Sequence, residues 1–332
     1  MSEDKATFEA PSNIALIKYW GVLDAALCLP RNTSISMTLD RCVTTCTAEP
    51  IDAASDEIWL AGANGLVTPT PGFAEPMVRH LDQLRRELGV RSKLRIATRN
   101  NFPSAAGLAS SASGFAALTL SAASALGRGL SPREASLLAR RSGSGSACRS
   151  VLGGYVEWAA GSDEESYARP LAPAGHWDLR DVIAVVETGP KAISSRDGHA
   201  LASTSPYFER RQELLPDRLA RVRTALAERD FPTLGATIEE EAIDLHLIAM
   251  SSQPAIFYWS PGTLEILRAV RELRREGLPA YSTMDAGANV HVLCEPAAEG
   301  ALVERLESLG SVGFVIRDGV GTGPERLTEH LI

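Results

Sequence analysis

The sequence predicts an α+β fold arranged as two lobes, and three observations support this. The chain has 332 residues, and single hydrophobic cores stop growing at about 250 to 300 residues. Strand-like and helix-like segments follow one another without strict alternation, and no repeat of fixed period is visible, which favours an α+β architecture. We expect an N-terminal lobe over residues 1–180 and a C-terminal lobe over residues 181–332, with the boundary after the Gly, Ser, Asp and Pro-rich stretch 161–178.

Short strands begin the N-terminal lobe. Residues 6–60 carry Thr, Val, Ile and Trp at spacing two, with Pro and Gly between the segments, which predicts strands and hairpins. Residues 74–88 carry apolar side chains at helical spacing and Gly89 follows them, so a helix is expected there. The segment LRIATRNNFP predicts a further strand, which leads into a Gly and Ser-rich loop and then an Ala and Leu-rich buried helix.

Helices dominate the rest of the chain. Ser131, Pro132 and Glu134 supply a cap, a proline at the first helical position and an acid at the third, which together mark a helix start. The apolar segment DLRDVIAVVETG predicts the strand that opens the second lobe. Helices are then expected around residues 205–228, 231–249 and 260–276, and strands around HVLCEP and GFVIRDG.

Composition argues against several classes of function. The 41 acidic residues outnumber the 33 basic ones and give a net charge of −8, which argues against a nucleic-acid partner. No run approaches the roughly 18 apolar residues of a membrane span, and the start MSEDKATFEAPSN lacks the order of a signal peptide. We therefore expect a cytoplasmic protein with no membrane partner. The five cysteines form no CxxC pair, which favours buried free thiols over a metal site.

Two Gly and Ser-rich stretches point to an anionic ligand. Residues 103–114, PSAAGLASSASG, combine a glycine that permits close backbone approach with serines at a helix start, where unpaired N–H groups favour an anion. The stretch lacks the ending of a Walker loop and the GxGxxG spacing, and tight packing of a small-residue helix is the alternative. Residues 140–154, RRSGSGSACRSVLGG, form a second stretch, and Arg149 offers a planar fork for carboxylate or phosphate.

The most specific signal comes from five segments in a fixed order. They are APSNIALIKYWG with LPRNTSISMTL (10–39), FPSAAGLASSASGFAAL (102–118), SGSGSACRSVLGGYVEW (142–158), SSRDGH (194–199) and TMDAGANV (283–290). Together they resemble the mevalonate diphosphate decarboxylase branch of the GHMP kinase superfamily, over nearly the whole chain. The resemblance implies a two-lobed GHMP kinase fold, with an N-terminal lobe similar to a ribosomal-protein fold, a C-terminal α+β lobe and an active site between them.

The resemblance also implies a reaction, that of an ATP-dependent carboxy-lyase in the mevalonate isoprenoid pathway. Such enzymes use ATP and Mg²⁺ to phosphorylate the tertiary 3-hydroxyl of a 5-phosphorylated mevalonate, and loss of phosphate and carbon dioxide leaves an isopentenyl product. A tertiary hydroxyl is a poor leaving group until it is phosphorylated. Positive charge developing at its carbon then draws electrons from the carboxylate. The family is often dimeric, but the sequence gives no independent indication of an interface.

Three residues match the catalytic positions of the family. Asp285 in TMDAG matches the aspartate that orients or deprotonates the 3-hydroxyl, and a turn aspartate beside Gly287 is the alternative. Arg149 matches the arginine that holds the substrate carboxylate and organises that aspartate, and a surface arginine is its alternative. Lys18 of the KYWG motif matches the lysine that neutralises charge near the reacting centre, and a surface lysine at a strand end is its alternative.

The remaining matches are to binding positions. The residues expected to hold the ATP phosphates are Gly107, Leu108, Ser110, Ser111 and Ser113, and Ser111 is also the expected magnesium contact. The residues expected on the substrate side are Asn13, Tyr19, Trp20, Ser144, Gly145, Ser146 and Arg196, with residues 144–146 at the 5-phosphate end. Lys191 is a weaker candidate for an anion contact.

Three departures from the family pattern bear on the substrate. Val22 follows Gly21, whereas relatives that use a diphosphate commonly read KYWGK, so a basic side chain is missing where the terminal phosphate would bind. Ala288 replaces a frequent proline, and His199 stands where methionine is common. We therefore expect 5-phosphomevalonate as substrate and isopentenyl phosphate as product. The alternatives are a 5-diphosphomevalonate decarboxylase that makes isopentenyl diphosphate, then a mevalonate 3-kinase or a non-catalytic ATP-binding protein.

Overall fold

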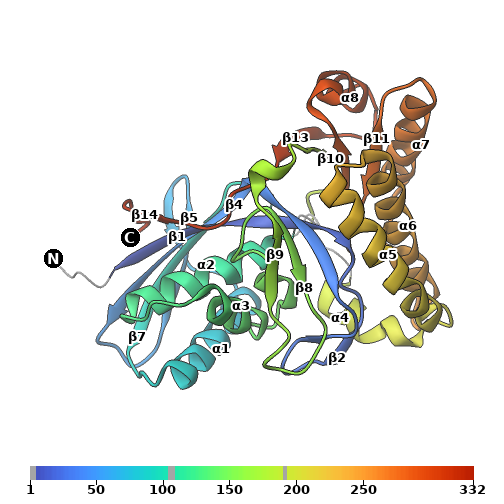
Figure 1. Ribbon diagram of the computed structural model, residues 1–332. Helices are drawn as coiled ribbons and strands as arrows, with labels where there is room; N and C mark the ends of the chain where they lie inside the picture. Colours follow the sequence, from blue (N-terminus) through green and yellow to red (C-terminus); the bar gives the residue numbers. More distant parts are fainter. Residues whose placement is uncertain (1–4, 104–108, 190–192) are drawn as a thin grey trace.

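A mixed eight-stranded sheet forms the larger part of the computed structural model, which describes residues 5–103, 109–189 and 193–332 (Figure 1). Its strands are β1 (Ala6–Ile17), β4 (Ser34–Ile51), β5 (Glu57–Gly62), β6 (Gly65–Val67), β7 (Lys93–Asn100), β8 (Tyr155–Trp158), β9 (Ala168–Ala172) and β14 (Glu325–Leu327). Six of them lie in the order β14-β1-β4-β7-β5-β6, while β8 pairs with β4 and β9 pairs with β8. The pairings are antiparallel except for that of β5 with β7.

Three helices cover one face of this sheet: α1 (Pro71–Leu88), α2 (Ser110–Ala125) and α3 (Pro132–Arg140). The end of α1 and the start of α3 follow the local sequence as expected, whereas α1 begins at Pro71, three residues before the predicted range. Gly89 ends α1 in the left-handed region at φ 68°, and its N–H donates to Arg85 O. Ser131 and Glu134 form the reciprocal capping box at the start of α3. Between α3 and β8, the 3₁₀ turn η1 (Gly145–Cys148) carries the second Gly and Ser-rich stretch.

The second sheet belongs to the C-terminal half and is antiparallel. Its strands are β10 (Arg180–Val185), β11 (Ala280–Thr283), β12 (Val290–Cys294) and β13 (Phe314–Gly319), in the order β11-β12-β10-β13. Alternate residues of β10 enter different cores: Val182 and Ala184 pack with α7 (Pro261–Arg275) and α8 (Glu299–Glu307), whereas Ile183 and Val185 pack with α5 (Phe208–Glu228) and α6 (Phe231–Ser251). This alternation is the strand period that the apolar sequence of β10 requires.

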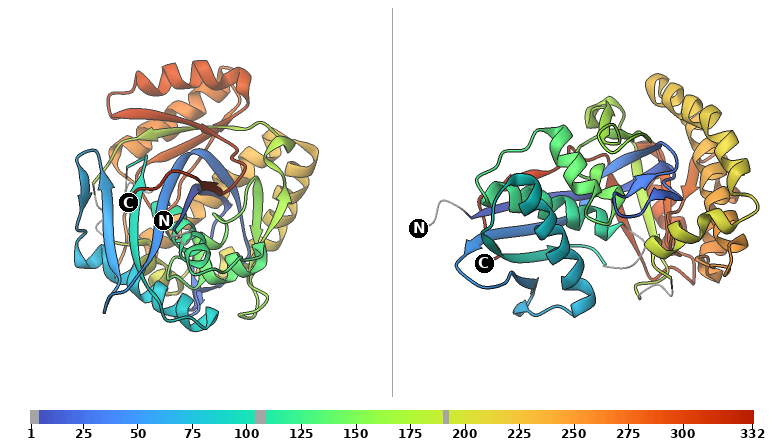
Figure 2. Two further views of the ribbon diagram at one scale, coloured as in Figure 1. Left: turned by 90° about the vertical axis from the view of Figure 1, so that its left-hand side faces the viewer. Right: turned by 90° about the horizontal axis from the view of Figure 1, so that it is seen from below.

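A shared core joins the two halves. Long strands β1 and β4 extend beyond the region covered by α1–α3, and their Ile14, Leu16, Ile35 and Met37 pack in the same core as α5 and α6. The chain also returns at its C-terminal end, because β14 pairs with β1 and Lys5 Nζ donates to Ile332 O at 2.9 Å. Figure 2 shows the start of β1 and the C-terminal end of the chain on the same side of the molecule. The division at residues 180 and 181 stays a proposal.

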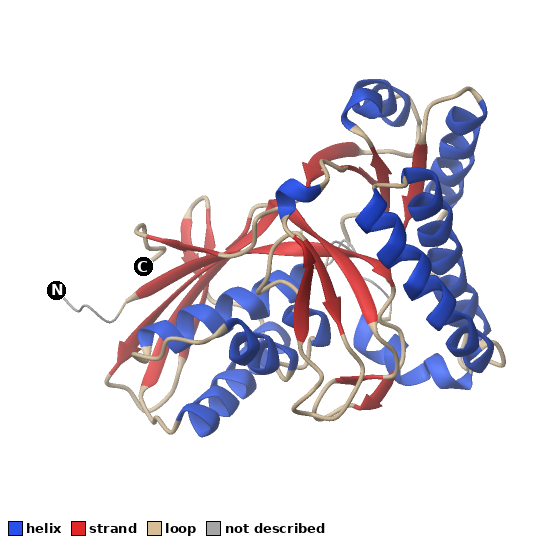
Figure 3. Ribbon diagram, viewed as in Figure 1, coloured by secondary structure: helices blue, strands red, loops and turns tan. Residues whose placement is uncertain are grey.

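The smaller elements complete the secondary structure seen in Figure 3. They are the hairpin β2 (Val22–Asp24) with β3 (Leu29–Pro30), the helix α4 (Ser195–Leu201), and the 3₁₀ turns η2 (Ala174–His176), η3 (Ala202–Thr204) and η4 (Pro296–Ala298). All five cysteines are buried free thiols, as the sequence predicts. Among the described residues, no helix has the length and apolar character needed to cross a membrane.

Candidate active site

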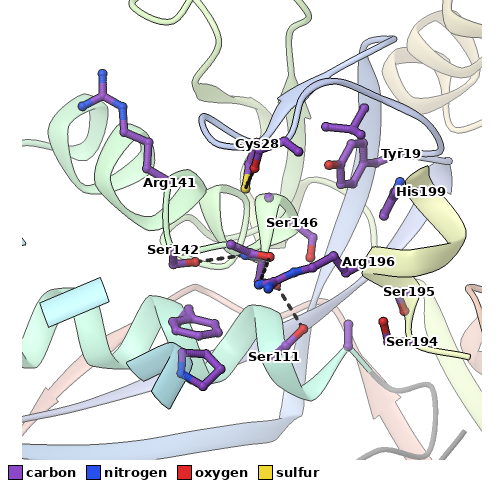
Figure 4. Close-up of a pocket in the computed structure, with 18 of the residues that line it drawn as sticks. Tyr19, Cys28, Ser111, Arg141, Ser142, Ser146, Ser194, Ser195, Arg196 and His199 are labelled. Carbon is purple, nitrogen blue, oxygen red and sulfur yellow. Dashed lines mark hydrogen bonds between the residues drawn. The ribbon is translucent and has the colours of Figure 1, made fainter. Parts of the chain in front are cut away.

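A cavity of about 1140 Å³ contains most of the candidate site residues. Its wall is formed by the end of β1, one side of α1, the start of α2, the loop 141–146, helix α4 and residues 285–286. The motifs therefore meet at one place although they are far apart in sequence. Figure 4 shows Ser111, Ser146, Arg196 and His199 around this space.

Lys18 and Asp285 form a direct ion pair at the cavity. Lys18 follows the end of β1 and is fully buried, and its Nζ donates to Asp285 Oδ1 at 2.7 Å and to Ala15 O at 2.6 Å. Burial lowers the pKa of Lys18, although the two nearby carboxylates Asp285 and Glu241 oppose the change. Burial by itself would raise the pKa of Asp285, but the Lys18 ammonium brings it below its usual value. The ionised form of the Asp285 carboxylate is thus favoured, and it can accept a proton or a hydrogen bond.

Asp285 is more than a turn residue. Its backbone does form a turn, because Gly287 N donates to Asp285 O at 2.8 Å. Its side chain, however, leaves that turn and lies at the cavity against Lys18. The alternative of a turn aspartate therefore accounts for the backbone only.

Arg149 is held in a fixed orientation by neutral groups. Its Nε and Nη2 donate to Asn13 Oδ1 at 3.2 and 3.0 Å, and its Nη1 donates to Ser34 Oγ at 2.6 Å. Asn13 is fixed in turn, because its amide donates to Ser150 Oγ at 2.8 Å. Arg149 is 2% exposed and still contributes to the cavity wall, whereas Asn13 is buried behind it.

These contacts change two of the predicted roles. Asn13 is expected on the substrate side, but in the structure it lies off the cavity wall and orients Arg149. Arg149 is expected to organise Asp285, but among the described residues the direct partner of the Asp285 carboxylate is Lys18. The guanidinium donates to Asn13 and Ser34 instead, while its positive charge contributes to lowering the pKa of Asp285.

The loop 142–146 and Arg196 form another part of the cavity wall. Ser144 Oγ lies 3.0 Å from Ser111 Oγ, which joins this loop to the start of α2. Arg196 on α4 donates from Nη2 to Gly143 O at 2.9 Å (Figure 4). Gly143 has φ +91°, a conformation that favours glycine, and a Cβ there would lie 2.4 Å from Arg196 Nη2 and would displace the end of that side chain. Gly145 and Ser146 complete the wall.

The start of α2 fits a phosphate. Ala109 precedes the helix in the left-handed region at φ 49°, and no side chain caps the helix, so its first N–H groups are available to an anion. Ser111 is exposed at the cavity. Its hydroxyl is the one candidate magnesium contact from the sequence, and Mg²⁺ commonly takes few protein ligands beside phosphate oxygens. The residues present therefore fit a nucleotide phosphate with its magnesium.

The other predicted phosphate contacts divide into two groups. Ser113 is buried, with its Oγ 2.6 Å from Thr44 Oγ1 and 3.2 Å from Ser110 O, so it faces the sheet and not the cavity. Helical spacing explains this, because residues 111 and 113 lie on different faces of α2. Ser110 is half-buried and off the cavity wall. Gly107, Leu108 and Lys191 lie outside the described residues.

Aromatic rings form the substrate-side wall at Tyr19 and Trp20. Tyr19 stacks on His199 at a centroid distance of 3.9 Å and meets Trp158 edge-on at 4.7 Å. Gly21 N donates to His199 Nδ1 at 3.1 Å, which leaves the proton of the neutral ring on Nε2. Burial lowers the pKa of His199 to about 3, so the ring is neutral. His199 lines the cavity, a role that the sequence marks only as a departure from methionine.

Residues of α1 also reach the cavity and were missed in the sequence. Arg79, Gln83 and Arg86 lie on its wall. They recur at spacings of four and three on the side of α1 away from its apolar stripe. A polar stripe at helical spacing is therefore the signal that could have located them.

Two family models match this chain, one in its N-terminal part and one in its C-terminal part. A model described as the diphosphomevalonate decarboxylase-like N-terminal domain matches residues 10–168, and one described as the mevalonate 5-diphosphate decarboxylase C-terminal domain matches residues 181–318. The diphosphomevalonate decarboxylase of Aspergillus fumigatus is 36% identical, over 99% of this chain and 95% of that protein. This chain belongs to the diphosphomevalonate decarboxylase family.

Solved structures of the diphosphomevalonate decarboxylase family share the fold. Mevalonate diphosphate decarboxylase from Staphylococcus aureus matches with a TM-score of 0.91 and 36% identity, over 97% of this chain and 98% of that chain. A complex of a protein named MDDEF with MVAPP, AMPPCP and magnesium matches with a TM-score of 0.89 and 37% identity, over 97% and 98%. The predicted family and its two-lobed α+β fold are confirmed, which places the chain among the ATP-dependent decarboxylases of a phosphorylated mevalonate.

Proposed function

We propose that this chain catalyses the ATP-dependent decarboxylation of 5-diphosphomevalonate to isopentenyl diphosphate. The observation that carries the proposal is the Asp285 carboxylate, held by Lys18 Nζ at 2.7 Å beside Arg149 in a cavity that also contains an anion-binding loop. The names of the relatives support the diphosphate, and the MDDEF complex holds MVAPP together with AMPPCP and magnesium. They favour the alternative substrate over the monophosphate expected from Val22.

Each residue of the site has a separate role in the proposed reaction. ATP with Mg²⁺ supplies the phosphoryl group that converts the 3-hydroxyl into a leaving group. Asp285 accepts the hydrogen bond of that hydroxyl and orients it. Lys18 keeps the carboxylate ionised and offsets negative charge in a dry environment, where a fixed charge acts strongly. Arg149, fixed by Asn13 and Ser34, presents the second N–H of its Nη1 and Nη2 to the substrate carboxylate, the group that leaves as carbon dioxide.

Because Val22 stands where relatives that use a diphosphate commonly have a lysine, other groups must offset the charge of the second phosphate. Arg196 is exposed at the cavity, and its Nη2 donates to a neutral carbonyl, Gly143 O. The neutral His199 offers Nε2–H, and the loop 142–146 offers serine hydroxyls next to it. A cavity of about 1140 Å³ is large for a single small ligand. The site can therefore offset a diphosphate without a lysine after Gly21.

The test of this proposal is the stoichiometry of the reaction. The protein is incubated with MgATP and 5-diphosphomevalonate, and ADP, phosphate and carbon dioxide are measured together. We expect one of each per turnover, with isopentenyl diphosphate as the organic product. ADP with a stable 3-phosphate and no carbon dioxide would show a kinase instead. Nucleotide binding without ADP formation would show a non-catalytic protein.

Two sequence-based expectations stay predictions. One is a homodimer, and the other is a cytoplasmic location.

A further inference from the structure

We propose that Glu241, which lies outside the cavity, is a positioning residue for Lys18. The inference rests on the proposed function, because it assigns Glu241 a part in the same reaction. Glu241 is on α6 and is fully buried. It does not line the cavity, and it matches none of the motifs that locate the site in the sequence.

Glu241 holds the main-chain N–H of Lys18. Lys18 N donates to Glu241 Oε1 at 3.2 Å. The same oxygen accepts from Arg211 Nη2, and Glu241 Oε2 accepts from Arg218 Nη1 at 2.7 Å. The carboxylate is therefore fixed by two arginines of α5, and it also accepts a hydrogen bond from the main-chain N–H of Lys18.

The carbonyl of Lys18 is held by the same cluster. Arg211 Nη2 donates to Lys18 O at 2.8 Å, and Asn32 Nδ2 donates to it at 2.9 Å. Arg211 Nη1 also donates to Asn32 Oδ1 at 3.3 Å. Both backbone groups of Lys18 thus have side-chain partners, and those partners are linked to one another.

The position of Lys18 in the chain explains why such partners are needed. The last register pair of β1 with β4 is Ile17 with Ile35, so Lys18 comes directly after the ladder. Buried backbone groups without partners are costly, and Lys18 is fully buried. Glu241, Arg211 and Asn32 replace the missing strand partners.

The choice of a charged cluster points to a role beyond folding. Neutral groups would satisfy one N–H and one carbonyl, and apolar replacement of a buried ion pair is often neutral or stabilising. Here the carboxylate is also the second negative charge near the Lys18 ammonium, after Asp285. The other charged groups near Lys18 are Arg149 after η1, Asp181 on β10 and Arg211 on α5. Without Glu241, the repulsion of the Lys18 ammonium by Arg149 and Arg211 is less compensated, because in the described part of the chain Asp285 is its one ionic contact.

The lysine content of the chain permits a test that does not depend on activity. There are four lysines, at positions 5, 18, 93 and 191. Protein labelled with ¹³C at lysine Cε therefore gives few signals, and the Lys18→Arg variant assigns that of Lys18. The signal is titrated by NMR in the full-length protein and in Glu241→Gln, which keeps the shape and one acceptor oxygen but removes the charge. Glu240→Gln is the matched control, because Glu240 is on the same helix, is 46% exposed and contacts Arg218 and Arg221 instead.

We expect the Lys18 midpoint to fall by about one pH unit in Glu241→Gln and to stay unchanged in Glu240→Gln. With 5-diphosphomevalonate, kcat of Glu241→Gln should fall roughly tenfold or more, while KM stays within about twofold. Glu241→Asp keeps the charge but moves the carboxylate away from Lys18 N. In this variant the titration midpoint of Lys18 should return to its wild-type value, while kcat should stay low.

The opposite results would overturn the inference. A folded Glu241→Gln with the wild-type Lys18 midpoint and kcat would leave Glu241 a structural role alone. If Glu241→Gln does not fold, the positioning role is tested with Glu241→Asp, and a wild-type kcat in that variant would contradict the proposal. Failure of the proposed function is recognised separately: the wild type would not release carbon dioxide, while the titration of Lys18 would still measure the effect of Glu241.

Discussion

The two walls of the cavity are built in opposite ways. One wall, which we call the closed wall, carries Arg149 and Asp285 and is backed by Lys18. Arg149 is 2% and Lys18 0% exposed, and protein groups hold both from several directions. On the other wall, which we call the open wall, Ser111 and Arg196 are exposed, and the loop 142–146 is joined to each of them by a single hydrogen bond. The first wall is complete before any ligand binds. The second offers donors that a ligand can still occupy.

This difference agrees with the roles that the proposed function gives to each wall. A group that acts in the transition state is most effective when its orientation is fixed beforehand. A group that neutralises phosphate contributes through charge and hydrogen bonds that tolerate adjustment. Substitutions in the first wall should therefore lower kcat, and substitutions in the second should raise KM.

The largest effect is expected for Asp285→Asn on the closed wall. Asparagine keeps the shape and an oxygen for Lys18 but cannot take a proton from the 3-hydroxyl, so kcat should fall by roughly 1000-fold or more. ATP affinity, measured by calorimetry, should stay within about twofold because the phosphate contacts are on the other wall. Undiminished turnover in this variant would remove Asp285 from the mechanism.

A smaller loss is expected for Arg149→Lys. Lysine keeps the charge but cannot contact Asn13 and Ser34 together as the guanidinium does, so we expect kcat/KM to fall roughly 100-fold. Steady-state release of carbon dioxide measures this. Arg133→Lys is the control, since Arg133 is exposed in the same lobe and donates to Glu164 O. Equal activity of the two variants would show that Arg149 acts through charge alone.

The open wall is tested by Arg196→Gln. The glutamine amide can still donate to Gly143 O, but the positive charge is lost. We expect KM for the phosphorylated mevalonate to rise roughly tenfold, with kcat within about threefold. Arg31→Gln removes another exposed arginine, one paired with Glu209 at 3.5 Å, and should leave both constants unchanged. A fall in kcat with constant KM would place Arg196 with the closed wall.

The smallest change is expected for Val22→Lys, which restores a basic residue after Gly21. Val22 is half-buried at the cavity, so the new ammonium adds to cations already present. We expect KM for the diphosphate to fall by about two- to fivefold, because an added partly exposed charge contributes modestly. Inhibition of turnover by the added lysine would show that the space beside residue 22 is occupied by a part of the substrate other than its phosphates.

Local signals in the sequence predicted most of the fold. Gly89 and the Ser131 and Glu134 capping box fix their helix ends within a few residues of themselves, so the sequence reveals them directly. The C-terminal return of β14 to β1 was not predicted, because strand pairing depends on residues more than 300 positions apart, as at Thr7 and Leu327.

The candidate site was predicted as a set of residues but not as a set of contacts. The family motifs located Lys18 and Asp285, but not that these two form the ion pair, which joins residues 267 positions apart. Glu241 contacts Lys18 across 223 positions, and it stands among other acids of α6 that have no such contact. Residue type and local spacing carry no information about pairs of this kind, which the packing of α6 on β1 creates.

Substrate choice tests the account most directly, because it asks whether the open wall accepts a second phosphate without a lysine at Val22. The measurement is kcat/KM for 5-diphosphomevalonate and for 5-phosphomevalonate with MgATP, following ADP and carbon dioxide. We predict a preference for the diphosphate of roughly tenfold or more, which corresponds to one or two charge-assisted hydrogen bonds. Equal efficiency, or a preference for the monophosphate, would contradict the proposed function and restore the expectation drawn from Val22.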